Sequence, residues 1–429
     1  MGEERTVMFG KRLLQHFDFH PEYRNLNHGS FGASPRDIRR YMKHHHDLCE
    51  AMPDSYIRYE YPVILDECRA AMAKFVNAPT DTIVFVSNAT TGVNTVLRNL
   101  VWNDDGRDEI LYFNTVYGGC AKVIDYIVDS SLGKVASREI NISYPCEDED
   151  IVQALHAALG DVASAGKRAK ICLFDVVSSL PGVRFPFEAV TRACREAGVL
   201  SLVDGAQGVG LTDIDLERLD PDFFVSNCHK WLFVPRSCAV FYVPLRNQHM
   251  ITSTMPTSHG YVPRTGSRFN PLPPSNKPAF INNFEFIGTV DSSPYVCVKE
   301  AIEWRERVLG GEAKILEYTH NLAREGGRVV ARILGTEVLD NESRSMSRCP
   351  MTNVALPIDA EAASMSTQDW MMRTMIKDYK TFLALRFHEG RLWARLSAQV
   401  YLDMEDFEWA GHMLLELCER VKRGEVDKA

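Results

Sequence analysis

The feature that most constrains this chain is an alternation of short apolar runs with helical patterns between residues 81 and 243. Each run is rich in aliphatic, aromatic and β-branched residues and is too short for a helix, so it predicts a buried strand. Helices predicted at 147–166 and 186–197 separate several of these runs. Such alternation is typical of an α/β fold with a mostly parallel sheet covered on both faces. The predicted strands are residues 81–86, 109–113, 170–174, 199–203, 222–225 and 238–243.

Polar side chains recur where these predicted strands end. Thr90 and Tyr117 follow the first two strands, and Asp175 and Asp204 follow two of the later ones. The carboxyl ends of parallel strands meet at one edge of the sheet, which is where ligands bind in open α/β folds. We therefore expect a binding site at this edge.

Lys230 lies between two apolar runs, directly after the predicted strand 222–225. A lysine kept from water has a lowered pKa and becomes a usable nucleophile, which is the property that a Schiff-base lysine needs. The alternative is a surface lysine whose aliphatic stem lies along Trp231. The hexapeptide from Ser226 to Trp231 is compatible with both.

The segment from Ser87 to Gly92 links a predicted strand to a helical pattern. A helix N-terminus with hydroxyl donors favours a phosphate, although N-capping alone explains the same residues. The segment has no P-loop lysine and no Gly-x-Gly-x-x-Gly pattern, so a nucleotide is not the first choice of ligand. Tyr117, on a glycine-rich turn, suits stacking on a planar cofactor, proton donation or simple core packing.

Two segments lack any periodicity. Residues 26–35 hold Asn27 and His28 together with two glycines and a proline, which suits a binding loop or an ordinary capped turn without regular structure. Residues 256–283 contain six prolines and predict a long functional loop. With 429 residues, the chain is too long for one small core. We expect an N-terminal arm at 1–35, a large domain at 36–291 and a smaller α+β domain at 292–429.

Composition narrows the range of partners. The net charge of −9 and the lack of a basic block argue against nucleic acid, and no run of about eighteen apolar residues predicts a membrane span. The charged N-terminus predicts no secretory signal, and eleven scattered cysteines without a Cys-x-x-Cys pair are typical of a cytoplasmic protein. Histidines 44–46 splay around a helix, so no metal site is expected. We expect a small-molecule substrate.

Taken together, these parts suit pyridoxal 5′-phosphate (PLP). Lys230 would carry the cofactor as a Schiff base, and Asp204 would keep its pyridine nitrogen protonated. Tyr117 would provide an aromatic platform. The phosphate of PLP adds about two negative charges, which a helix N-terminus and nearby polar side chains would partly neutralise. The expected phosphate ligands are Ala89, Thr90, Ser226 and His229.

The motifs SNATTGVN, LVDGAQGVG, SNCHKW, EFIGTVD and WARLSAQVY follow one another along the chain. In their order and spacing the chain resembles fold-type I, class V aminotransferase-like PLP enzymes, a group that includes isopenicillin N epimerase-like proteins and cysteine desulfurases. The resemblance covers nearly the whole chain. The motifs LNHGSFG, NTVYGGC, DVVSSLPGVRFPFE and RLSAQVYLD are most similar to fungal hercynylcysteine sulfoxide lyases of ergothioneine synthesis, with related enzymes in loline-type alkaloid pathways.

The resemblance implies a large domain with a mixed, mostly parallel sheet, a smaller C-terminal α+β domain, and a homodimer with active sites at its interface. Gln207 would donate to the phenolic oxygen of PLP, and Thr289 would reach the phosphate in the neighbouring subunit. Arg395 would clamp the substrate α-carboxylate, and Asn27 and His28 would lie beside the substrate. The full expected cofactor-binding set is Ala89, Thr90, Tyr117, Asp175, Asp204, Gln207, Ser226, His229, Lys230 and Thr289.

The reaction that the resemblance implies is β-elimination from a cysteine sulfoxide conjugate. Lys230 would take the Cα proton and Tyr117 would protonate the leaving group, which gives a sulfenate that is later reduced to a thiol, pyruvate and ammonia. A cysteine desulfurase would instead need a mobile cysteine, for which Cys349 is the nearest candidate, although its apolar setting suits a buried edge. An aminotransferase, an epimerase and an enzyme forming a carbon–carbon bond at Cα stay open. Intact Lys230, Asp204 and Arg395 argue against a non-enzymatic scaffold.

Overall fold

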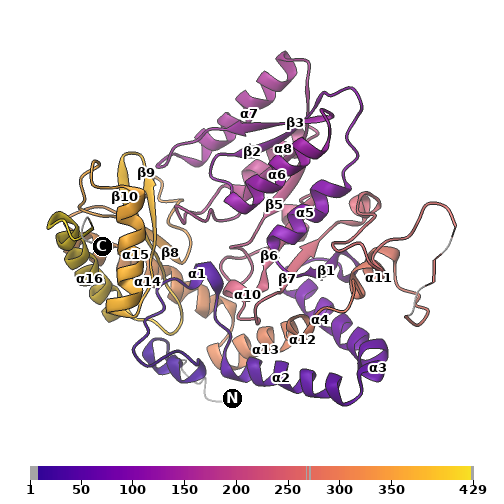
Figure 1. Ribbon diagram of the computed structural model, residues 1–429, viewed down its shortest axis with the longest axis horizontal. Helices are drawn as coiled ribbons and strands as arrows, with labels where there is room; N and C mark the ends of the chain where they lie inside the picture. The colour runs from indigo at the N-terminus through magenta and orange to yellow at the C-terminus, as the bar shows by residue number, and fades with distance from the viewer. Residues whose placement is uncertain (1–7, 267, 270–271, 427–429) are drawn as a thin grey trace.

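The computed structural model describes residues 8–266, 268–269 and 272–426, so the N-terminal segment in which no secretory signal is expected lies outside it. A seven-stranded sheet with the order β1-β7-β6-β5-β4-β2-β3 forms its centre (Figure 1). Strands β2 to β6 pair in parallel, whereas β7 runs antiparallel to β6 and β1. This confirms the mixed, mostly parallel α/β sheet. The strands are β1 Ile83–Val86, β2 Asp108–Phe113, β3 Val135–Ile140, β4 Arg168–Asp175, β5 Leu200–Asp204, β6 Phe223–Asn227 and β7 Ala239–Tyr242.

Both faces of this sheet are buried, which is why its strands consist of continuous apolar runs. Successive residues of a strand point to opposite faces, and in β1 Val84 and Val86 join one core while Ile83 and Phe85 join the other. The first core is closed by α5 Ala89–Asn99 and α6 Gly118–Ser130. The second is closed by α4 Tyr61–Phe75, α7 Asp148–Ser164 and α8 Phe187–Glu196.

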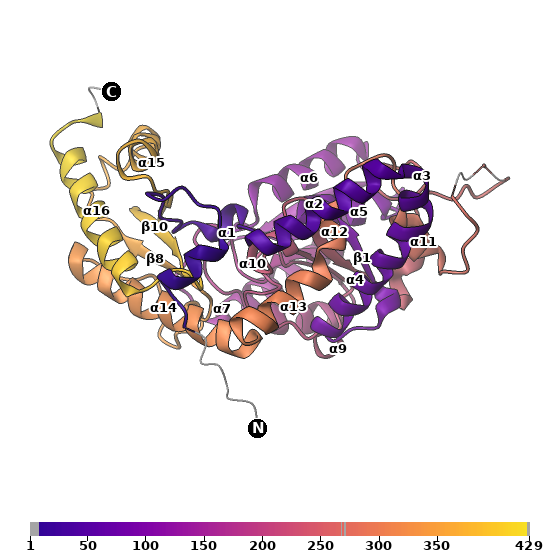
Figure 2. The same ribbon diagram turned by 90° about the horizontal axis from the view of Figure 1, so that it is seen from below.

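The remaining helices before residue 310 connect these layers or lie along the N-terminal part of the chain. Among them, α1 and α10 lie between the large sheet and the C-terminal layer in both views (Figures 1 and 2). The bounds are η1 Lys11–His16, α1 His28–Phe31, α2 Arg36–Ala51, α3 Pro53–Ser55, η2 Tyr56–Glu60, η3 Thr80–Thr82, α9 Leu216–Leu219, α10 Cys228–Trp231, η4 Leu245–Met250, α11 Ala279–Glu285, α12 Ser293–Val296 and α13 Val298–Leu309.

The C-terminal part folds as a second layer around a small antiparallel sheet of order β8-β10-β9 (Figure 2). Helices α14 and α16 pack closely, because a Cβ at Gly326 of α14 would lie only 2.3 Å from the ring of Phe407 in α16. The α+β character expected for this part is confirmed. The bounds are α14 Glu312–Leu334, β8 Met351–Ala355, α15 Met365–Tyr379, β9 Ala384–His388, β10 Arg391–Ser397 and α16 Met404–Lys422.

The domain boundary before residue 292 stays a prediction. Helices α12 and α13, which follow it in the chain, pack against α4 and α2 of the preceding part. Within the described residues, no helix combines the length and the apolar character needed to cross a membrane.

The structure differs from the sequence-based expectation in five elements. Strands β3 and β9 were not expected, because both are partly exposed edge strands with mixed polarity. The sequence also predicts a strand at residues 336–340, but the structure has only one bridge there, from Val338 to Val354. Residues 28–31 form one helical turn inside the expected irregular loop, and α11 begins within the predicted loop 256–283.

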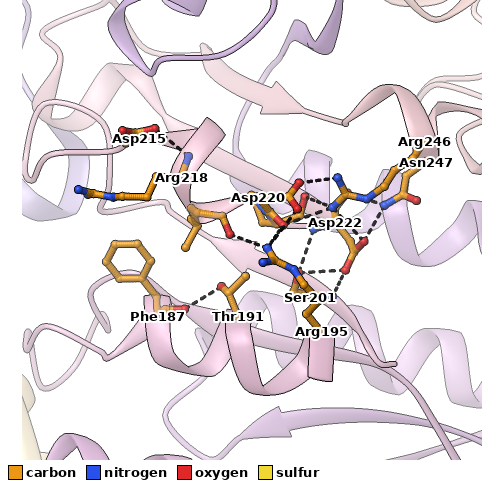
Figure 3. A network of polar contacts seen from close by, with 12 residues as sticks. Phe187, Thr191, Arg195, Ser201, Asp215, Arg218, Asp220, Asp222, Arg246 and Asn247 are labelled. Carbon is orange, nitrogen blue, oxygen red and sulfur yellow. Dashed lines mark hydrogen bonds and ion pairs between the residues drawn. The ribbon is translucent and has the colours of Figure 1, made fainter. Parts of the chain in front are cut away.

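Polar groups at the amino edge of the sheet are paired with one another (Figure 3). Asp222, just before β6, accepts hydrogen bonds from the backbone N–H and the hydroxyl of Ser201 in β5, at 3.0 and 3.1 Å. Asn247 donates to the same carboxylate at 2.9 Å, and Arg246 forms an ion pair with Asp220 at 2.5 Å. These contacts are structural, and the candidate site lies at the opposite, carboxyl edge described below.

Candidate active site

Lys230 lies on α10, the single helical turn that follows β6 at the carboxyl edge of the sheet. Its side chain is half-buried, and its Nζ has no hydrogen-bond or ion-pair partner among the described residues. Burial lowers the pKa of Lys230 to about 8, and the positive charge of Arg395 adds to the decrease, while Asp204 and Asp175 oppose it. Near neutral pH, a larger share of this amine than of an ordinary lysine is therefore neutral and nucleophilic.

Asp204 ends β5 and is 2% exposed. One carboxylate oxygen accepts a hydrogen bond from the backbone N–H of Ala206 at 2.9 Å, and the other from the thiol of Cys120 at 3.3 Å. Burial raises the pKa of Asp204, and these two hydrogen bonds oppose the increase. Asp175 ends the neighbouring strand β4 and is the register partner of Asp204. Two of the expected site residues therefore lie side by side.

The segment with Asn27 and His28 packs against α10, the helical turn that carries Lys230. His28 is fully buried, with Nε2 at 2.7 Å from the carbonyl oxygen of Lys230 and Nδ1 at 2.9 Å from the hydroxyl of Tyr401. Burial lowers the pKa of His28 to about 3, so the neutral ring donates through Nε2 and accepts at Nδ1. Both nitrogens are thus engaged, which argues against substrate binding by His28. The ring instead holds the backbone of Lys230.

Gly32 closes this segment with a φ of +63°, and a Cβ there would lie 1.9 Å from the carbonyl oxygen of His229. We expect Gly32→Ala to destabilise the protein by about 2–4 kcal/mol, because the added carbon forces the segment away from the Lys230 turn. Gly198→Ala is the matched control, with a φ of +67° and no atom within 4 Å of its Cβ. Denaturant titration measures both losses, and equal losses would show that the close approach to His229 is unimportant.

Arg395 reaches the site from β10 and is 2% exposed. Its Nη1 donates to the carbonyl of Ser179 at 2.6 Å, and its Nη2 donates to Asn27 Oδ1 at 2.8 Å and to Ser30 Oγ at 2.7 Å. Gly182 lets the side chain pass, since a Cβ there would lie 2.7 Å from Arg395 Cδ. Asn27 therefore lies at the site as expected, and Ser30 is a neighbour that sequence reasoning missed.

The guanidinium of Arg395 has no carboxylate partner among the described residues, and its buried Nε has no hydrogen-bond partner at all. Burial lowers the pKa of Arg395 to about 10, so the group is still charged at neutral pH. A buried cation without a counter-ion is costly unless a ligand supplies the negative charge. The unpaired Nε–H and the positive charge of the guanidinium suit a carboxylate ligand.

Gln207 is engaged inside the protein. Its Nε2 donates to the carbonyl of Gly29 at 2.6 Å, and its Oε1 accepts from the indole N–H of Trp231 at 2.6 Å. With the side chain 2% exposed, one amide hydrogen is left for any other contact. Its expected role as the donor to the phenolic oxygen of PLP would use that hydrogen and stays a prediction.

The sequence predicts a phosphate contact for Ser226, but its neighbour Asn227 is the residue that faces the start of α5. Ser226 is fully buried; its hydroxyl donates to the carbonyl of Gly205 and accepts from the backbone N–H of Val209 at 2.9 Å. This engagement argues against a phosphate contact by Ser226. Because successive strand residues face opposite sides, Asn227 points the other way, and its Oδ1 accepts from the backbone N–H of Ala89 at 2.8 Å. Asn227 is therefore the residue that meets the start of α5.

The start of α5 offers hydrogen-bond donors to an anion. The backbone N–H and hydroxyl of Thr90 have no partner among the described residues, whereas the N–H of Thr91 is capped by Asn88 at 2.9 Å. His229 lies on the α10 turn, with Nδ1 at 2.9 Å from the carbonyl oxygen of Cys238, and burial lowers its pKa to about 4. An eleven-residue helix with an uncapped N–H suits a phosphate.

Two expected residues lie at more open positions. Tyr117 precedes α6 and is 52% exposed, and a Cβ at Gly119 would lie 2.7 Å from its ring, so the glycine makes room for this side chain. Thr289 lies in the segment between α11 and α12 and lines a pocket together with His46 and Tyr56. Its expected contact with a neighbouring subunit stays a prediction.

Cys349 precedes β8 and is fully buried, with Sγ at 3.5 Å from the carbonyl oxygen of Met351. Burial raises the pKa of this thiol to about 11, so almost none of it is thiolate at neutral pH. Neither property suits a mobile, nucleophilic cysteine.

The profile of the aminotransferase class-V family matches residues 55–363. The L-cysteine desulfhydrase-like protein lolT1 of Epichloe uncinata is 36% identical and is covered over 98% of both chains. The hercynylcysteine sulfoxide lyase of Schizosaccharomyces pombe is 31% identical over 96% of this chain and 98% of its own length.

Among solved structures, the cystine C–S lyase C-DES in complex with cysteine persulfide shares the fold, with a TM-score of 0.74 at 19% identity. The similarity covers 95% of this chain and 99% of that one. A family profile that spans most of the chain, together with full-length relatives above 30% identity, leads to one conclusion: the chain belongs to the aminotransferase class-V family.

Proposed function

We propose that the protein is a PLP-dependent C–S lyase that cleaves a cysteine sulfoxide conjugate by β-elimination. One observation carries this proposal: a largely unpartnered lysine amine, Lys230, lies near a buried arginine without a counter-ion, Arg395. An α-amino acid would present its Cα proton to the first residue and its carboxylate to the second. Membership of the aminotransferase class-V family and the C–S lyases among its relatives support PLP as the cofactor.

The residues at the carboxyl edge fit PLP. Asp204 would hold the ring nitrogen, and Lys230 would bind the aldehyde carbon. Thr90 and the start of α5, with Asn227 and His229, would hold the phosphate. When bound, PLP supplies an electron sink that stabilises negative charge at the Cα of an amino acid.

The chain's own residues divide the remaining tasks. Arg395 orients the amino acid by donating its unpaired Nε–H to the α-carboxylate, while Asn27 and Ser30 fix the guanidinium. Lys230 Nζ takes the proton from Cα, a task that its lowered pKa suits near neutral pH. Tyr117 Oη donates a proton to the departing sulfenate oxygen.

The atoms of this reaction balance without an oxidant or reductant. The Cα–H and Cβ–S bonds break, the sulfur leaves as a sulfenic acid, and the three-carbon product is an aminoacrylate. Water hydrolyses the aminoacrylate to pyruvate and ammonia. Reduction of the sulfenic acid to a thiol is a later reaction that needs an external reductant.

A sulfoxide of the hercynylcysteine type is the proposed substrate. The Schizosaccharomyces pombe hercynylcysteine sulfoxide lyase, matched over nearly its whole length, supports this choice. The buried state of Cys349 supports direct elimination over a mechanism that stores sulfur on a mobile cysteine.

A second candidate has an observation of its own. The desulfhydrase-like lolT1 is 36% identical to this chain, more than the sulfoxide lyase at 31%. The substrate test must therefore distinguish the sulfoxide lyase reaction from two alternatives, a desulfhydrase reaction on cysteine and carbon–carbon bond formation at Cα.

We further propose a homodimer in which Thr289 reaches the phosphate of the neighbouring subunit. Thr289 is exposed, as such a contact requires. All eleven cysteines are unpaired, which supports a reducing compartment such as the cytoplasm.

The substrate test incubates the PLP-loaded protein separately with hercynylcysteine sulfoxide, S-methyl-cysteine sulfoxide and cysteine, and measures pyruvate, sulfide and alanine. The proposal predicts pyruvate without sulfide, fastest from the hercynyl conjugate, and none from Lys230→Ala. Pyruvate with sulfide from cysteine alone would assign a desulfhydrase. Alanine formation would assign a desulfurase, and consumption without any of these products would favour bond formation at Cα.

The pH dependence of PLP binding tests the lowered pKa of Lys230. Only the neutral amine attacks an aldehyde, so the binding rate of the apoprotein should rise about tenfold per pH unit at low pH and level off above pH 8. Stopped-flow absorbance measures this rate. A rate that keeps rising through pH 10 would indicate an ordinary lysine with a pKa near 10.5.

A further inference from the structure

Two carboxylates are buried next to each other at the sheet edge. Asp175 and Asp204 are register partners on adjacent parallel strands and are 6% and 2% exposed. Two negative charges on adjacent side chains away from water repel each other. One carboxyl of such a pair therefore stays protonated over a wide pH range. The local contacts decide which of the two residues carries it.

Their hydrogen bonds differ. Asp204 receives a backbone N–H from Ala206 and a thiol S–H from Cys120, one on each carboxylate oxygen. Asp175 receives no hydrogen bond from any described residue, although it is nearly as buried. Donors stabilise the ionised form of a carboxylate, and a buried carboxylate without donors is more stable when protonated.

The other charged or titratable groups around Asp175 do not reverse this. Lys230 attracts a negative charge on Asp175, but its Nζ lies beyond the ion-pair distance of 4.0 Å from both carboxylates. Tyr144 is fully buried near Asp175, and burial raises its pKa, so it stays neutral. Burial and the neighbouring Asp204 raise the pKa of Asp175 well above its ordinary value.

One donor that the sequence led us to expect is only partly free. Gln207, expected to donate to the phenolic oxygen of PLP, uses its carbonyl and one N–H on Trp231 and Gly29, which leaves one N–H. A protonated carboxyl on the strand beside Asp204 would offer an O–H as a further donor.

We propose that Asp175 is the protonated member of the pair and donates a hydrogen bond to the phenolic oxygen of PLP, while Cys120 is a positioning residue that keeps Asp204 ionised. This rests on the proposed function, since it takes PLP as the ligand. It assigns opposite protonation states to neighbouring aspartates, an acid that donates and a carboxylate that accepts.

Infrared difference spectroscopy of the PLP-loaded protein at pH 7 reads the protonation directly. The carbonyl band of a protonated carboxylic acid should be present in the native protein and absent in Asp175→Asn. Asp406→Asn is the matched control, because Asp406 is also buried but is paired with Arg24 and accepts the backbone N–H of Asp403, so its removal should leave the band. A band that survives in Asp175→Asn, or disappears in Asp406→Asn, would overturn the assignment.

PLP affinity provides a second measurement that does not depend on turnover. Asp175→Asn keeps an N–H donor and should bind PLP within about threefold of the native protein, whereas Asp175→Ala should bind about tenfold more weakly through loss of one hydrogen bond. Equal weakening in both would show that a negative charge, and not a donor, matters at this position. Thermal unfolding of each variant identifies any loss of PLP affinity that comes from misfolding. If Asp175→Ala is misfolded, the affinity of Asp175→Asn decides the question.

Cys120 is tested through the same infrared band and through the pH titration of the visible absorbance. Cys120→Ala should shift the titration and leave the band in place or strengthen it, Cys120→Ser should restore the native titration, and Cys418→Ala, which removes another buried thiol, should change neither. If the titration of Cys120→Ala is the same as that of the native protein, Cys120 does not position Asp204. If Asp204→Asn binds PLP normally, the proposed function itself fails, whereas the Asp175 variants can fail while Asp204→Asn still loses the cofactor.

Discussion

Lys230→Ala is expected to lower kcat/KM for the preferred substrate by about 10⁴-fold or more, because it removes both the amine that binds the cofactor and the base that takes the Cα proton. The loss should fall mainly on kcat, since Arg395 still holds the substrate carboxylate. Steady-state kinetics measure the loss, and the visible spectrum should lack the absorbance of lysine-bound PLP.

Lys230→Arg should be as inactive as Lys230→Ala, because a guanidinium stays protonated in proteins. Lys122→Ala, which changes an exposed lysine of α6, should retain full activity. Substantial turnover by either Lys230 variant would transfer the proton abstraction to another residue.

Arg395→Lys is expected to lower kcat/KM by about 10²- to 10³-fold, although the positive charge is kept. A lysine ammonium cannot hold Asn27, Ser30 and the Ser179 carbonyl while it also donates to a carboxylate from the position of Nε. KM should rise and kcat should fall, because the guanidinium both binds and orients the amino acid.

Arg391→Lys is the matched control on the same strand, where the arginine is half-exposed and pairs with Glu337. It should stay within about twofold of the native protein, as expected for a surface ion pair. If Arg395→Lys behaved like Arg391→Lys, the substrate carboxylate would have to bind elsewhere.

Much of the fold follows from the sequence, because strands buried on both faces leave an unmistakable apolar run. The predicted strand at 170–174 and the predicted helix at 147–166 match β4 and α7 closely. Edge strands such as β3 were missed, since Ser137, Arg138 and Glu139 are polar, partly or fully exposed, and break the apolar pattern.

The set of strand ends that forms the site was also predictable. Thr90, Tyr117, Asp175, Asp204 and Lys230 all follow strands that run in one direction, so the sheet itself brings them to one edge. The register of individual side chains was harder to predict. Resemblance assigned the phosphate to Ser226, whereas the strand geometry turns Asn227 toward α5 and leaves Ser226 inside the core.

Contacts between distant parts of the chain could not be read from any local pattern. His28 and Gln207 are expected at the ligand from their motifs, yet each is committed to a partner far away in sequence, Lys230 and Gly29. Local sequence identifies which residues reach the site, but only the packing of the N-terminal segment beneath α10 decides which of them are still available to a ligand.

The most direct test of the central claim is to reduce the PLP-loaded protein with borohydride, digest it and locate the modified residue by mass spectrometry. Reduction fixes PLP to the amine with which it has condensed, so the account predicts one phosphopyridoxyl group per chain, on Lys230. A group on another lysine, or a protein that carries none after incubation with PLP, would contradict the account.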